Sequence, residues 1–220
     1  QHLVASQWRC HRSLVEQALT WIPAKVAAKT LHGLSKLLLA LVESAVLVNE
    51  NDVHADIVSV LQVEASWVGR ALGIGMLRIA HDTRHRIELP DLRLAPLQRF
   101  WSAKLTERVQ VAPRAGDDWS IDTAVPCDCE LCEVLRTFLR ATDRSRHEWP
   151  LAEAKRRHIH GVIDHLALPV SHITRRQGSP FVLVVEKTDL LFRRRDAERR
   201  AWHTDLAWLE RTSADFDDRA

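Results

Sequence analysis

The chain has 220 residues, of which 46% are hydrophobic, and its 31 basic and 29 acidic residues give a formal net charge of +2. This length allows one large domain or two small ones, with a buried core. No apolar run approaches the roughly 18 residues that a membrane span needs, and no secretory signal is visible. We therefore expect a cytoplasmic protein with no membrane partner.

The first part of the chain predicts helices. Glycine is scarce and tyrosine is absent, which favours a mainly α fold. Apolar residues recur at helical spacing over residues 26–48, 53–64 and 65–79. The last range contains three glycines, which allow close helix contacts or a break: Gly69, Gly73 and Gly75. We expect an N-terminal antiparallel helical array over residues 1–96.

The middle of the chain predicts a helix and an irregular connection, over residues 97–125. Leu97 to Val109 carries a helical pattern, and a stretch with prolines, a glycine and aspartates follows it. Beyond the connection we expect a small, zinc-stabilised α+β module over residues 126–190. A C-terminal helix and tail are expected over residues 191–220.

Two helical patterns lie within the expected module, at residues 132–139 and 151–165. A polar loop that ends at Trp149 and Pro150 is expected between them. Pro150 suits the first turn of the second helix, because that position needs no backbone N–H group.

The module ends in a predicted β-hairpin. The segments 169–173 and 181–185 are apolar enough to form strands, and they flank a turn over residues 176–180 that contains Gly178. We expect this one hairpin to be the β structure of the module.

Three cysteines lie within six residues at the start of the module: Cys127, Cys129 and Cys132. Zinc prefers four tetrahedral sulfur or nitrogen donors, and short spacings let one loop place several thiolates around one ion. The pattern follows a proline and enters a helix, whose first amides help to hold thiolate charge. We predict that these three thiols bind a structural Zn²⁺ ion.

A histidine from the basic segment that follows is the expected fourth ligand, and we favour His158. His165 lies seven residues later on the same helical face, and His172 on the first hairpin strand is also within reach by sequence. His160 points away from both His158 and His165. In the alternative interpretation the histidines are surface residues, and the thiols are redox-active, buried or idle. A closed four-ligand site would be structural and would tie helix 151–165 to the thiols.

Two other features carry less weight. Cys10 stands alone in a helical context, where we expect a small buried apolar residue. His54-Ala55-Asp56 matches half of an iron facial triad. That triad needs strands, whereas His54 lies in a helical pattern, so we expect no iron site there.

Residues 136–200 carry 15 lysines and arginines against 8 aspartates and glutamates. Such a block can attract phosphate or an acidic partner. The candidates for nucleic-acid or phosphate contact are Arg156, Arg157, Arg175 and Arg176. Few aromatic residues interleave with them, so no base-stacking platform is evident, and a solvated helical face is the alternative interpretation.

The motifs of the module form a recognisable series. It comprises Cys127-Asp128-Cys129-Glu130-Leu131-Cys132, Arg156-Arg157-His158 and Arg175-Arg176-Gln177-Gly178-Ser179-Pro180. Over about residues 97–190 the chain resembles the C-terminal, cysteine- and histidine-containing region of large bacterial and fungal proteins labelled 2-oxoglutarate/iron(II) oxygenases. The resemblance implies that the thiols are metal ligands with His158 as their companion. It does not extend to the catalytic barrel of those proteins.

We therefore expect a non-catalytic, zinc-stabilised interaction module that is the C-terminal part of a larger protein. Its expected partner is another protein or the remainder of that larger chain. Two alternatives remain open. One is a nucleic-acid-binding module that uses the basic face of residues 155–200, and the other is an accessory region of an oxygenase whose active site lies outside this chain. The sequence contains no GxSxG, P-loop or HExxH signature.

Overall fold

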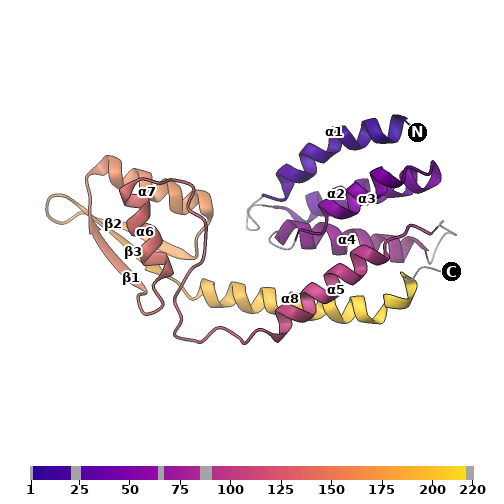
Figure 1. The fold of residues 1–220 in the computed structure, drawn as a ribbon. Coiled ribbons are helices and arrows are strands. Elements are labelled where there is room, and N and C mark those ends of the chain that lie inside the picture. Colours follow the sequence, from indigo (N-terminus) through magenta and orange to yellow (C-terminus); the bar gives the residue numbers. More distant parts are fainter. Residues whose placement is uncertain (1, 21–25, 64–66, 85–90, 217–220) are drawn as a thin grey trace. The chain divides into compact units, whose positions relative to one another are not determined.

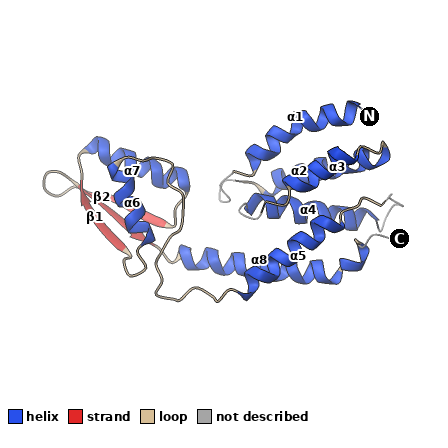
Figure 2. Cartoon of the chain, in the orientation of Figure 1, coloured by secondary structure: helices blue, strands red, loops and turns tan. Residues whose placement is uncertain are grey.

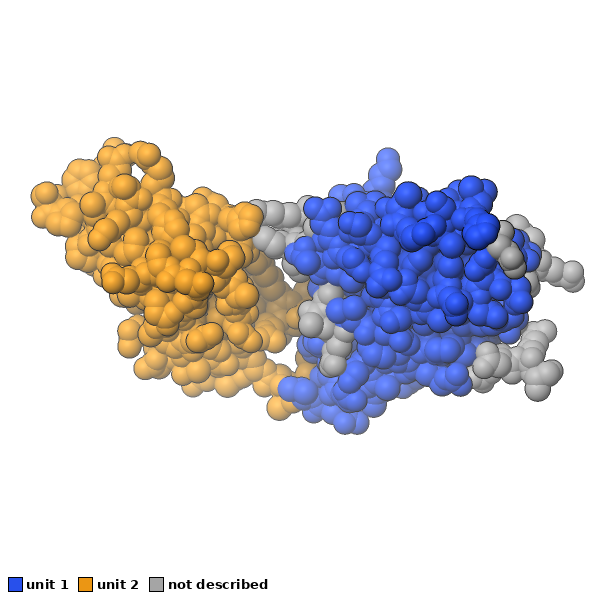
Figure 3. All heavy atoms as spheres, turned by 45° about the horizontal axis from the view of Figure 1, so that its top comes forward, with its two compact units in different colours: residues 1–111, 201–220 blue, residues 112–200 orange. Residues whose placement is uncertain are grey.

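The computed structural model describes four stretches of the chain, residues 2–20, 26–63, 67–84 and 91–216. They belong to two compact units, shown in different colours in Figure 3. The helical unit comprises residues 1–111 and 201–220, and the α+β unit comprises residues 112–200. The chain is mainly α with a small β part, as predicted (Figures 1 and 2). The four-part division predicted from the sequence, with boundaries after residues 96, 125 and 190, stays a prediction.

The helical unit contains α1 (His2–Ala18), α2 (Ala28–Leu47), α3 (Asn51–Val60), α4 (Trp67–Arg84), α5 (Ala95–Gln110) and the end of α8 (Leu190–Arg211). Helix α2 packs against α1, α3 and α4, and α4 packs against α5. The helices turn apolar stripes inward, and one cluster of buried side chains results, which includes Leu38, Ile57, Leu72 and Met76. The predicted helices at 26–48, 53–64 and 65–79 correspond to α2, α3 and α4.

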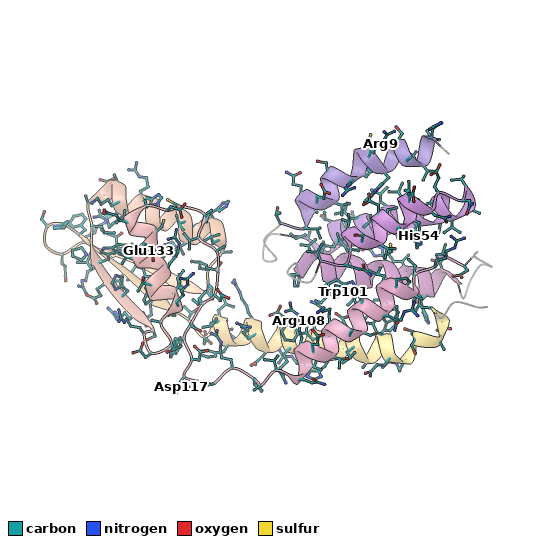
Figure 4. The ribbon with its side chains drawn as sticks, viewed as in Figure 1. Arg9, His54, Trp101, Arg108, Asp117 and Glu133 are labelled. Carbon is teal, nitrogen blue, oxygen red and sulfur yellow. The ribbon has the colours of Figure 1, made fainter. Side chains whose placement is uncertain are left out.

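Two glycines let neighbouring helices approach α4 closely. A Cβ atom at Gly73 would clash with the indole ring of Trp101 on α5, and one at Gly75 would lie 2.7 Å from Ser35 Oγ on α2. Trp101, labelled in Figure 4, is only 2% exposed. Helix α4 continues through both glycines, so they serve close contact and do not break the helix.

Helix α2 is long and apolar enough to cross a membrane by length and composition, although Lys36 and Glu43 interrupt its sequence. The core helix of a soluble protein meets the same criteria, and 44% of the apolar window is buried inside the fold. Such a helix is therefore weak evidence of a membrane span. The absence of a membrane partner stays a prediction.

The α+β unit contains α6 (Glu130–Arg140), β1 (Arg146–Pro150), α7 (Glu153–Leu166), β2 (Val170–Arg175), β3 (Val182–Lys187) and the start of α8. Its antiparallel sheet has the strand order β1-β3-β2. Leu183 of β3 pairs with Trp149 of β1 and with Thr174 of β2. The core of this unit contains residues of α6, α7 and β3, among them Leu135, Phe138, Ile159, Ile163, Leu183 and Val185.

Strands β2 and β3 confirm the predicted hairpin. The prediction of a polar loop that ends at Trp149 and Pro150 is wrong, because Arg146–Pro150 forms strand β1. Exposed and half-buried residues alternate along β1: Arg146 and Glu148 are exposed, and His147 and Trp149 are half-buried. This strand is short and partly charged, so its period-2 pattern does not stand out. Pro150 ends this edge strand, where the lack of an N–H group is tolerated, and α7 begins only at Glu153.

The irregular connection before the thiols is held against the core of the α+β unit. The backbone N–H of Trp119 donates to the carbonyl of Thr142 at 2.8 Å, and that of Ile121 donates to the carbonyl of Leu139 at 2.7 Å. Ile121 and Val125 are buried in the same apolar cluster as α6. The connection is thus fixed at the end of α6 and returns along the unit to the start of that helix.

Candidate metal centre

The three thiols gather at the start of α6. Cys127 precedes the helix, Cys129 is its N-cap residue, and Cys132 lies in its first turn. Cys132 shares the buried face of α6 with Leu135, Phe138 and Leu139. This helical phase leaves Cys132 with 0% exposure, whereas Cys129 is exposed.

Helix α7 brings His158 to the thiols. Ile159 and Ile163 anchor α7 in the core, with 0% and 2% exposure, and α7 contacts α6. His158 directly precedes the buried Ile159, so its side chain lies at the border of the contact between α6 and α7. The imidazole thereby reaches the start of α6.

The four donor atoms form a compact group. His158 Nε2 lies 3.7 Å from Cys127 Sγ, and its distances to the Sγ atoms of Cys129 and Cys132 are 3.4 Å and 3.3 Å. All four donor atoms lie within 4.8 Å of one another. In a tetrahedral zinc site with Zn–S bonds of about 2.3 Å and Zn–N bonds of about 2.0 Å, sulfur and nitrogen donors are about 3.5 Å apart. The group can therefore hold a metal ion.

Hydrogen bonding and burial move the pKa values of two thiols in opposite directions. The backbone N–H of Cys132 donates to the sulfur of Cys129, and this bond, with smaller contributions from neighbouring side chains, lowers the pKa of Cys129 to about 6. Burial, followed by the neighbouring thiols, raises the pKa of Cys132 to about 12. A divalent cation among them would deprotonate the thiols, because only thiolates coordinate metals strongly.

Arg136 supports the group, and the sequence interpretation missed it. Its guanidinium donates to the main-chain carbonyl of Cys127 at 2.5 Å and to the carboxylate of Asp128 at 2.8 Å. A further bond joins it to Glu133 on the same helix. These bonds fix the loop that carries Cys127 to the side of α6. The one sequence cue is that Arg136 lies four residues, or one helical turn, after Cys132.

The other histidines considered from the sequence lie outside this group. Nδ1 of His172 on β2 is 2.5 Å from Nδ1 of His160, and its Nε2 is 3.1 Å from Asp164 Oδ1. His160 Nε2 in turn lies 3.2 Å from Thr174 Oγ1. These side chains connect α7 to β2, and neither His172 nor His165 joins the thiols.

Arg156, the first of the predicted phosphate contacts, is only 8% exposed. Its guanidinium donates to the main-chain carbonyls of Leu151 and Phe181 and lies 5.3 Å from the centre of the Phe181 ring. Arg156 therefore ties the start of α7 to the segment before β3. This largely buried position disfavours a phosphate contact of Arg156, which stays a prediction.

The other three arginines are exposed. Arg157 pairs with Glu153 at 2.8 Å, and Arg175 pairs with Glu148 at 2.6 Å. Arg176 follows β2 in the turn of the hairpin. Arg157 and Arg175 thus pair with different carboxylates, and the contact of the four arginines with nucleic acid stays a prediction.

His54 and Asp56 serve the packing of the helical unit. His54, labelled in Figure 4, is 9% exposed, and its Nε2 donates to the carbonyl of Leu92 at 2.9 Å. Asp56 accepts hydrogen bonds from Trp8 and Arg12, both at 2.7 Å. The two side chains thus make separate packing contacts, and the absence of an iron site there stays a prediction.

The fourth cysteine, Cys10, lies on α1 and is exposed. The prediction that it is buried is wrong. Helix α1 turns Val4, Trp8 and Val15 inward, and Cys10 lies two residues after Trp8, which places it about 200° around the helix.

Comparison of the chain with protein-family models, with curated proteins and with solved structures finds no match. The resemblance to the C-terminal region of 2-oxoglutarate/iron(II) oxygenases therefore stays a prediction. The functional assignment rests on the geometry of the α+β unit.

Proposed function

We propose that Cys127, Cys129, Cys132 and His158 bind one structural Zn²⁺ ion, and that the α+β unit is a non-catalytic interaction module stabilised by this ion. The observation that carries the proposal is the convergence of the four donor atoms within 4.8 Å. Three sulfur atoms and one imidazole nitrogen are a donor set that zinc adopts in structural sites.

The number of donors favours a structural role over a catalytic one. Structural zinc has four protein ligands, whereas catalytic zinc keeps one position for water or substrate. The four side chains here would complete a tetrahedron, because the distances from His158 Nε2 to the three Sγ atoms, 3.3–3.7 Å, are those of adjacent ligands. No coordination position is then left for a reacting group.

The ion would link segments that lie far apart in the sequence. His158 follows Cys127 by 31 residues and Cys132 by 26 residues. Structural zinc contributes about 10 kcal/mol or more of binding free energy in zinc-finger peptides. A link of this strength between the start of α6 and α7 supports the small core of the α+β unit, as metals do in other small folds.

Cobalt(II) titration tests the donor set. Tetrahedral Co²⁺ with thiolate ligands has intense visible and charge-transfer bands, which octahedral Co²⁺ with oxygen ligands lacks. We expect these bands to saturate at one Co²⁺ per chain and to disappear when Zn²⁺ displaces it. Cys132→Ser should lose them, and Cys10→Ser, which removes an exposed thiol of α1, should keep them. A wild-type chain without tetrahedral bands would refute the proposal.

A second pair of variants tests the histidine. In His158→Ala the imidazole is lost, so we expect weaker metal binding and a shift of the cobalt bands. The control is His203→Ala, which removes an exposed histidine of α8 and should leave the spectrum unchanged. Identical spectra in His158→Ala and wild type would remove His158 from the ligand set.

The partner of this module is proposed to be another protein or the remainder of a larger chain. Nucleic-acid binding has less support, because Arg156 is buried and two of the exposed arginines, Arg157 and Arg175, are paired with carboxylates. It would be recognised by salt-dependent retention on nucleic acid that Arg175→Ala with Arg176→Ala reduces. A role as accessory region of an oxygenase rests on the resemblance alone.

A further inference from the structure

The three thiols differ in their access to solvent. Cys129 is exposed, Cys127 is half-buried, and Cys132 has 0% exposure. An open hollow of ≈ 310 Å³ borders the group on the side of His158, with Pro126 and Gly161 in its wall. A small oxidant can reach Cys129 directly, because this thiol is the exposed one of the three.

Cys129 and Cys132 are arranged as a dithiol pair. Two residues separate them: Cys129 is the N-cap residue of α6, and Cys132 lies in the first turn of this helix. A Cys-x-x-Cys motif at a helix start favours a reactive thiolate. The two Sγ atoms are within 4.8 Å, so side-chain rotation can bring them to the roughly 2.05 Å of a disulfide bond. Cys127 and Cys129 would close a smaller ring, with one residue between them.

We propose that hydrogen peroxide oxidises Cys129, and that the resulting disulfide with Cys132 releases the zinc ion. This inference rests on the proposed zinc site and concerns the regulation of that site. It makes Cys129 a modification site and the α+β unit sensitive to peroxide.

The reaction balances with one peroxide per chain. The Cys129 thiolate attacks one peroxide oxygen, the O–O bond breaks, and a sulfenic acid and hydroxide form. The Cys132 thiolate attacks the oxidised sulfur, an S–S bond forms, and a second hydroxide leaves. Two thiolates thus lose two electrons to one peroxide, and two protons from solvent convert the hydroxides to water.

The disulfide would not replace the link that the ion provides. Both of its cysteines belong to the start of α6, so the new bond restrains a single turn and leaves His158 on α7 untied. Cys127 and His158 remain as donors, which is too few for a structural zinc site. Oxidation therefore removes the tie between α6 and α7, and a dithiol reductant with added zinc restores it.

The wild-type chain serves for the test, so no outcome depends on the folding of a variant. Its zinc content is measured first, and about one equivalent of hydrogen peroxide is then added. A chromogenic chelator follows zinc release, and alkylation with mass spectrometry identifies oxidised thiols over time. Cys10 is the internal control, because it is an exposed thiol outside the group.

We expect zinc release to accompany a disulfide between Cys129 and Cys132, while Cys10 remains free to alkylate. We expect Cys129 to be oxidised before Cys10, because coordination keeps it as the thiolate that attacks peroxide. Zinc that stays bound after Cys10 is oxidised, or a disulfide that omits Cys129, would overturn the redox proposal and leave the zinc site standing. A wild-type chain with no zinc before peroxide is added would overturn both.

Discussion

His158 Nε2 lies 3.3 Å from Cys132 Sγ, at the point where α7 meets the first turn of α6. Cys132 has 0% exposure and belongs to the apolar cluster of the α+β unit. The candidate metal centre is thus continuous with the core on one side and reaches solvent through Cys129 on the other. Changes at this centre should therefore alter the stability of the unit as well as its metal content.

Removal of the metal should destabilise the α+β unit by several kcal/mol, because binding of a structural ion is coupled to folding. We expect a chelator to accelerate hydrogen exchange of the β3 amides more than a hundredfold, if the opening of this strand follows the stability of the unit. The amides of α2, in the helical unit, are the control and should exchange as before. Unchanged exchange of β3 after metal removal would contradict a structural role for the ion.

Arg136→Ala should weaken zinc binding by about 10- to 100-fold, as the loss of groups that position metal ligands does. The variant loses the bond from the guanidinium to the carbonyl of Cys127, which holds that ligand near the others. Competition with a chelator of known affinity measures the effect. Arg140→Ala is the matched control, because Arg140 is exposed on the same helix. Equal affinities of the two variants would remove Arg136 from the centre.

Gly73→Ala should destabilise the helical unit by about 1–3 kcal/mol, the usual cost of overpacking, because the new Cβ atom would clash with the indole of Trp101. Gly33→Ala is the control, since a Cβ atom at Gly33 on α2 meets nothing within 4 Å. Alanine is the better helix former, so this variant should gain about 0.5–1 kcal/mol. Chemical denaturation of both variants measures the pair, and a stabilised Gly73→Ala would contradict the close contact of α4 and α5.

Lys187 should titrate far below an ordinary lysine. Its side chain is 3% exposed and donates to the carbonyls of Leu139 and Ala141, and burial lowers its pKa from 10.5 to about 8. The ¹³Cε chemical shift of Lys187, assigned by its absence in Lys187→Met, should give a midpoint near the lower value. A midpoint near 10.5 would show that the ammonium group is not desolvated.

The same pKa shift fixes the sign of a stability effect. Between pH 8 and 10.5 the unfolded chain holds a proton on Lys187 that the folded chain has lost. The contribution of Lys187 to stability should therefore rise as the pH rises through this window and be lowest below pH 8. Hydrogen exchange of β3 amides, corrected for intrinsic rates and compared with Lys187→Met, checks the direction.

The parts of the centre that depend on local spacing could be predicted from the sequence. Cys127, Cys129 and Cys132 lie within six residues, so almost any turn into a helix places them together. The sequence favours His158 as the fourth ligand, but its spacing does not exclude His165 or His172 from that role. Only the packing of α7, set by Ile159 and Ile163, decides which ring meets the thiols.

Other features depend on contacts that carry no local signal. Arg136 has no motif, and its role follows from the path of the loop before α6. Strand β1 is visible only through its pairing with β3, because charged Arg146 and Glu148 dilute its apolar alternation. The burial of Arg156 likewise depends on the carbonyls of Leu151 and Phe181, which the fold brings to it from outside α7.

The metal content of the purified, untagged wild-type chain, measured by plasma mass spectrometry beside Cys132→Ser and Cys10→Ser, tests the central claim most directly. The proposal of a structural zinc ion predicts about one zinc per chain in wild type and in Cys10→Ser, and its loss in Cys132→Ser. A wild-type chain that contains no zinc, although purified without chelator, would contradict it, as would a Cys132→Ser chain that keeps its full zinc content.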